Sequence, residues 1–116
     1  MNEQKQQAAV LSACLAKPVM LTELIDYADD SIVSKTIIDK PVGTITLFAF
    51  DRGQKLSEHT APFDAVVQVL NGRAQLSIAG KQTTVEAGEI IIMPANVPHA
   101  VAAQERFKML LTMIRA

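Results

Sequence analysis

Short runs of alternating hydrophobic and polar residues cover most of this chain, and residues that favour turns separate them. In the segment 73–78, Ala, Leu and Ile alternate with Arg, Gln and Ser, which predicts a strand with one buried face. The segments 32–39 and 44–51 are rich in Ile, Val, Thr and Phe, which favour strands. Strands at such short intervals predict an all-β fold, a small antiparallel β-barrel, because no alternation of strands with helices competes.

The N-terminal part has a different pattern. Residues 2–17 contain Glu, Gln, Lys, Ala and Leu and no Gly, a composition that predicts a helix. Pro18 should end this helix, because the residue before a proline disfavours helical backbone. A second short helical turn is predicted over 21–27 from the spacing of its leucines and isoleucine. We therefore expect a short helical arm over residues 1–30, followed by a barrel domain over residues 31–116.

Composition narrows the function classes. The chain has 116 residues and a formal net charge of −1, and its basic residues are scattered singly, so no nucleic-acid partner is expected. No apolar run is long enough for a membrane span, so no membrane partner is expected either. The single cysteine, Cys14, fits a reducing compartment. Residues 11–14 resemble a lipoprotein box but lack the preceding charged and apolar regions of a signal peptide, and we expect a cytoplasmic protein.

Only two histidines are present, His59 and His99, and each lies in a spaced motif. His59 follows Gly53 after five intervening residues, and Gly72 comes later in the same frame. His99 lies in a second frame that begins with Gly88 and contains Pro94.

These two frames resemble the motifs of the cupin family, in which G-x5-H-x-H-x3,4-E-x6-G precedes G-x5-P-x-G-x2-H-x3-N. The resemblance covers residues 32–114 and implies a small single-domain cupin with an RmlC-like jelly roll. Family metal sites use three histidines and a glutamate from these motifs, so the resemblance implies that His59 and His99 are metal ligands. Ala61 and Ala65 stand where the second histidine and the glutamate would be. Any divalent metal (Zn, Ni, Fe or Mn) would therefore have an incomplete, two-histidine site.

Strand alternation also predicts which side chains face the barrel interior. Besides the two histidines, the residues expected to line a cavity are Phe48, Val67, Met109 and Leu111. Apolar walls with two polar points are typical of a small-molecule site. The nearest carboxylate, Asp64, is one residue from the vacated glutamate position and should face away unless a bulge at Pro62 and Phe63 redirects it.

The sequence is compatible with three functions. The first is a small cupin that binds a small molecule in its barrel, with catalytic residues unknown. The second is a mononuclear metal-dependent dioxygenase or isomerase of the cupin type. The third is a non-catalytic structural or sensory module. The resemblance and the apolar residues on both faces of segment 32–39 predict a homodimer in each case, because exposed sheet edges and faces are usually covered.

Overall fold

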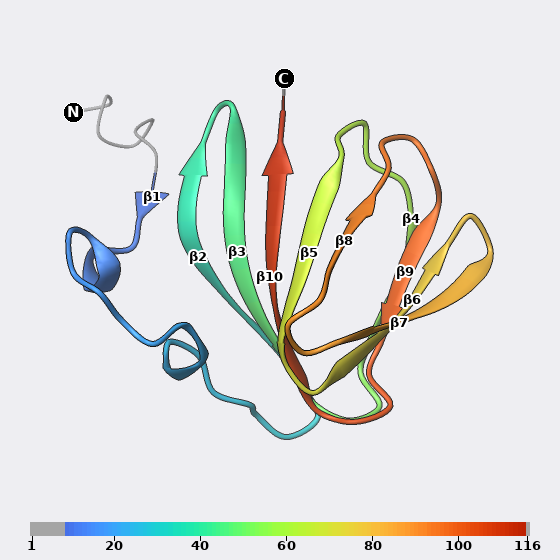
Figure 1. Cartoon of the computed structure of the whole chain (residues 1–116), viewed down its shortest axis with the longest axis horizontal. Coiled ribbons are helices and arrows are strands. Elements are labelled where there is room, and N and C mark those ends of the chain that lie inside the picture. The colour runs from blue at the N-terminus through green and yellow to red at the C-terminus, as the bar shows by residue number, and fades with distance from the viewer. Residues whose placement is uncertain (1–8, 116) are drawn as a thin grey trace.

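Two antiparallel sheets pack face to face in the computed structural model, which describes residues 9–115 (Figure 1). One sheet contains, in spatial order, β1 (Ala9–Val10), β2 (Ile32–Lys40), β3 (Gly43–Phe50), β10 (Phe107–Ile114), β5 (Ala65–Asn71) and β8 (Ile90–Met93). The other contains β4 (Lys55–His59), β9 (His99–Ala102), β6 (Arg73–Ile78) and β7 (Lys81–Glu86). The prediction of an all-β antiparallel barrel is confirmed.

The hydrophobic core lies between the two sheets. Ala74 and Leu76 of β6 have no accessible surface, so the alternation predicted for 73–78 is confirmed. Phe50 of β3 and Phe107 of β10 are opposite each other in the register, and their rings stack with centroids 4.5 Å apart. This stacked, fully buried pair stabilises the six-stranded sheet at the end where β3 finishes and β10 begins.

The helix predicted over residues 2–17 is wrong for the part of it that the structure describes. Residues 2–8 lie outside the described residues, and Ala9–Val10 form β1, followed by a single 3₁₀ turn, η1 (Ser12–Cys14). The backbone of β1 pairs with Asp39 and Ile38 on the edge of β2, which supplies hydrogen bonds that outweigh a modest helix propensity. No helix among residues 9–115 has the length and apolar character needed to cross a bilayer.

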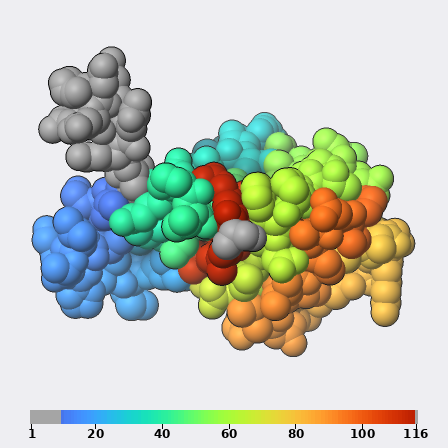
Figure 2. Space-filling view, turned by 90° about the horizontal axis from the view of Figure 1, so that it is seen from above, coloured from blue at the N-terminus to red at the C-terminus, as the bar shows by residue number. Residues whose placement is uncertain are grey.

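The second half of the arm packs on the outer face of the six-stranded sheet. A 3₁₀ turn, η2 (Leu21–Glu23), confirms the predicted helical turn in shortened form. Ile25 is buried against Leu47 and Ala49 of β3, and Val33 and Ile37 of β2 pack around them. The outward apolar side chains of β2 are therefore covered within the chain. Figure 2 shows the arm in blue beside β2 and β3, at the end of the molecule farthest from the second sheet.

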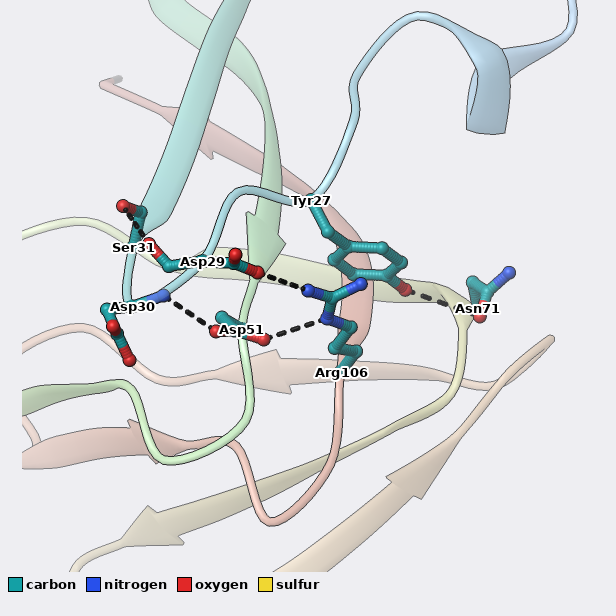
Figure 3. Close-up of polar contacts among 7 residues, drawn as sticks. All are labelled: Tyr27, Asp29, Asp30, Ser31, Asp51, Asn71 and Arg106. Carbon is teal, nitrogen blue, oxygen red and sulfur yellow. Dashed lines mark hydrogen bonds and ion pairs between the residues drawn. The ribbon is translucent and has the colours of Figure 1, made fainter.

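A polar cluster fastens the arm to the barrel (Figure 3). Arg106 donates from Nε to Asp51 at 2.8 Å and from Nη2 to Asp29 of the arm at 3.0 Å. The backbone N–H of Asp30 donates to the other oxygen of Asp51 at 2.7 Å. The guanidinium also lies 5.2 Å from the ring centroid of Tyr27, within the range of a cation–π contact.

Removing Arg106 should change the titration of Asp51. The hydrogen bond from Arg106, and after it the N–H of Asp30, lowers the pKa of Asp51 to about 2. A pKa below the unfolded value means that this carboxylate stabilises the docked arm above about pH 4 and loses that effect as the pH falls toward 2. The variant Arg106→Met should raise the pKa of Asp51 toward its ordinary range, measured by ¹³C carboxyl NMR.

The matched control for that titration is Arg73→Met. Arg73 forms an exposed ion pair with Glu105 at 3.2 Å and makes no hydrogen bond to Asp51 in the part of the chain that the structure describes. Equal Asp51 midpoints in the two variants would contradict the assignment of the lowered pKa to Arg106.

Candidate functional site

The two histidines meet across a pair of neighbouring strands. His59 is the last residue of β4 and His99 the first of β9, and the register places them directly opposite each other. Their ring centroids are 4.4 Å apart, and the planes meet edge to face at 70°. His99 is only 3% exposed, whereas His59 is exposed. The pair therefore has an inner ring and an outer ring.

Each ring is held through Nδ1 by a backbone carbonyl two residues earlier in the chain. Nδ1 of His59 lies 2.8 Å from the carbonyl oxygen of Ser57, and Nδ1 of His99 lies 3.1 Å from that of Val97. A carbonyl oxygen can only accept, so both Nδ1 atoms carry the proton and donate. In a neutral imidazole Nε2 is then an unprotonated acceptor. The local backbone thus sets the same tautomer in both rings.

Two hydrogen bonds link the turns next to the histidines. The N–H of Ala95 donates to the Asp64 carboxylate at 2.8 Å, and the N–H of Asn96 donates to the carbonyl of Ala61 at 2.7 Å. Asn96 adopts a left-handed φ of 64°, which asparagine tolerates better than most residues. These bonds join the turn after His59 to the turn before His99 and so position the pair. The Asp64 carboxylate accepts a hydrogen bond from this turn, which is consistent with the prediction that Asp64 faces away from the site.

A cavity of about 190 Å³ adjoins the two rings. All residues that line it, other than the histidines, are apolar. They come from both sheets and from the turn after β4: Leu56, His59, Ala61, Ala65, Met93, His99, Val101, Met109, Leu111 and Met113. An engineered apolar cavity of about 150 Å³ accommodates benzene, so this cavity has room for one small ring with a substituent.

Part of this lining follows from the sequence pattern. Of the six expected residues, His59, His99, Met109 and Leu111 line the cavity. Phe48 and Val67 belong to the same core cluster but are not among the lining residues, because alternation fixes the face of a strand and leaves the depth along the barrel open. Leu56, Met93 and Val101 were missed. Met93 and Val101 share the parity of the inward residues on their strands, but no motif specifies them. Leu56 has the opposite parity to His59, and both line the cavity because the strand register shifts between them.

The side chains available do not complete a metal site. Among residues 9–115, no group of three or more His, Cys, Asp or Glu side chains is placed to hold one ion. The positions of the two missing ligands, Ala61 and Ala65, do line the cavity. Catalytic zinc sites use three protein ligands and structural ones four. The donor set therefore falls short of a resident metal centre.

The two packed antiparallel sheets form a β-barrel of the jelly-roll class, with a small cavity beside the paired histidines. The family model described as "Cupin domain" matches residues 46–114. The chain belongs to the cupin family, as the two motif frames predicted.

Solved structures give the same result. A conserved protein of unknown function from Streptococcus pyogenes is 36% identical, with a TM-score of 0.84 over 88% of this chain and 90% of that one. A cupin 2 conserved barrel domain protein from Leptotrichia buccalis is 42% identical, with a TM-score of 0.78 over 80% of this chain and 45% of that one. A cupin superfamily protein from Desulfitobacterium hafniense is 25% identical, with a TM-score of 0.83 over 88% and 94% of the two chains. Among curated proteins, no significant match was found.

Proposed function

We propose that this cupin binds a small, mostly apolar molecule in the barrel cavity, with the two histidines as its polar contacts. The observation that carries the proposal is the combination of an apolar cavity of about 190 Å³ with two imidazole rings at its wall. Small-molecule sites typically have this form, a largely apolar lining with a few convergent polar groups. The cavity is smaller than most such sites, so the ligand should be compact.

The metal-dependent dioxygenase or isomerase is the weaker candidate. Both Nε2 atoms are oriented as acceptors by their Nδ1 hydrogen bonds, which is how metal-ligating histidines are commonly held. Two neutral nitrogens nevertheless leave most of an ion's coordination to solvent. We therefore expect divalent metals to bind weakly, and we assign no reaction step to one.

Methionine methyl NMR tests the proposed function, because the chain contains its own control. Met93, Met109 and Met113 line the cavity, whereas Met20 is 64% exposed on the arm. Toluene or phenol added to protein labelled at the methionine methyl carbon should shift the three cavity resonances and leave Met20 unchanged. The variant Ala61→Leu should abolish these shifts, because it fills the cavity without altering either histidine.

Two outcomes would contradict the proposed function. One is that neither probe moves the cavity methyl resonances. The other is that Met20 responds as strongly as they do. In both cases the barrel would be better described as a structural or sensory module.

We further propose that the chain forms a homodimer through the outer face of the six-stranded sheet. Ile45, Thr112, Val66 and Ile92 are successive cross-strand neighbours. By alternation they face away from the core that contains Leu111 and Ile91. Ile92 and Ile90 are 58% and 62% exposed. A row without charged side chains can pair with its own copy about a two-fold axis without repulsion.

Sedimentation velocity tests this assembly. The wild-type protein should sediment with the mass of two chains at micromolar concentration, and Ile92→Glu should give the mass of one, because the new carboxylates would be desolvated at the interface. A single-chain mass for the wild-type protein would contradict the proposed dimer.

A further inference from the structure

We infer that the cavity selects a neutral, single-ring molecule bearing one hydroxyl group, a phenol-class compound, and that Nε2 of His99 accepts the hydroxyl proton in a hydrogen bond. The inference rests on the proposed function and specifies its ligand class. It follows from the hydrogen-bonding capacity of the lining, its lack of charge and its size.

The polar part of the lining can accept hydrogen bonds but cannot donate them. Both Nδ1–H groups are already donating to backbone carbonyls, those of Ser57 and Val97. Within the described residues, neither Nε2 has a hydrogen-bond partner. Every fully buried side-chain nitrogen or oxygen in that part of the chain does have one, so Nε2 of His99 keeps a small accessible surface, and its ring lines the cavity. A ligand that satisfies this atom must bring a donor.

The need for a hydrogen-bond donor on the ligand is stronger at His99, the inner ring, than at His59, the outer ring. His99 is 3% exposed, so a ligand in the cavity separates its Nε2 from water. His59 is exposed and can still be hydrated. A bound hydrocarbon would therefore leave one dehydrated, unpaired acceptor at His99, which is unfavourable. A hydroxyl group would convert that acceptor into a hydrogen bond.

The remaining lining disfavours anions. No Lys, Arg, Asp or Glu is among the lining residues of the described chain. A carboxylate or phosphate would meet two acceptors and an apolar wall, and burial of an unpaired charge is costly. A neutral hydroxyl group avoids this cost and still donates a hydrogen bond to Nε2.

The volume and the methionines favour an aromatic ring. A cavity of about 190 Å³ exceeds by a small margin the one of about 150 Å³ that accommodates benzene. Three of the lining residues are Met93, Met109 and Met113, and thioether sulfur makes favourable contacts with aromatic rings. A single ring with a hydroxyl group and at most one further small substituent fits these walls.

The test compares phenol with toluene, which has nearly the same shape but no donor. Dissociation constants are measured at pH 8 by methionine methyl NMR for the wild-type protein and for His99→Leu. Toluene is the more hydrophobic probe, so the informative quantity is the ratio of the two constants. We expect the preference for phenol over toluene to fall about ten-fold in His99→Leu, and to fall less in His59→Leu.

A control variant separates loss of the acceptor from a general loosening of the core. Val85→Ala shortens a buried side chain that does not line the cavity and keeps both histidines, so it should leave the phenol-to-toluene ratio unchanged. The dispersion of the backbone amide resonances verifies that each variant is folded. Benzoate should bind the wild-type protein at least ten-fold more weakly than phenol.

The outcomes distinguish failure of the phenol inference from failure of the proposed function. If both probes shift the cavity methyl resonances but their ratio is the same in wild type and His99→Leu, the cavity binds small molecules and the phenol inference is overturned. Tighter binding of benzoate than of phenol also overturns it. If neither probe binds, the proposed function itself fails.

Discussion

The double variant Ala61→His/Ala65→Glu is expected to bind Zn²⁺ about a thousand times more tightly than the wild-type protein. Both positions line the same cavity as His59 and His99, so the new side chains would enter the space beside the two Nε2 acceptors. Four-ligand zinc sites have apparent binding free energies of about 10–16 kcal/mol, or roughly 3 kcal/mol for each ligand. Two added ligands, discounted for imperfect geometry, correspond to about a thousand-fold gain.

Competition with a chromophoric chelator measures this gain, on protein without a histidine tag. Each single variant should give an intermediate affinity, and His99→Ala in the double variant should bring the affinity back down. A double variant no tighter than the wild-type protein would show that the four positions do not converge. The positional argument from the two motif frames would then fail.

The variant Gly72→Ala is expected to destabilise the fold by roughly 3–5 kcal/mol. Gly72 joins β5 to β6 with a φ of +74°, a conformation that L-residues rarely adopt. A Cβ there would also collide with the carbonyl oxygen of Arg106 and lie 3.0 Å from Cβ of Phe107. Backbone strain and a steric clash therefore act together at a turn that touches the buried Phe107.

Gly80→Ala is the matched control, measured by urea unfolding under the same conditions. Gly80 has a similar φ of +79°, but nothing lies within 4 Å of an added Cβ. It should lose only about 1 kcal/mol from strain. Equal losses at the two glycines would contradict the close approach of Arg106 and Phe107 to Gly72.

The sequence predicted the barrel well because its signals are local and repeated. Alternation over 73–78 identified the buried face of β6, and the β-rich segments 32–39 and 44–51 became β2 and β3. The two histidine frames indicated the family, and the same frames placed His59 and His99 at the facing ends of β4 and β9. Patterns of this kind depend on neighbouring residues alone, which is why they could be read without coordinates.

Features that depend on distant partners could not be predicted. Residues 9–14 have only a modest helix propensity, and β1 forms because the edge of β2 supplies its hydrogen bonds. Val67 and Phe48 have the expected parity, but their depth in the core depends on how the sheets pack. The tautomer of the histidine pair depends on the carbonyls of Ser57 and Val97, whose orientation no sequence pattern reveals.

The most direct test of a ligand held at the histidine pair is the long-range ¹H–¹⁵N NMR spectrum of the two imidazole rings, recorded at pH 8 with and without phenol. Both free rings should carry their proton on Nδ1. Saturation with phenol should shift Nε2 of His99 and leave its Nδ1 in place. A free ring protonated on Nε2, or a ring spectrum unchanged while the cavity methionine methyl resonances saturate, would contradict a ligand held at the histidine pair.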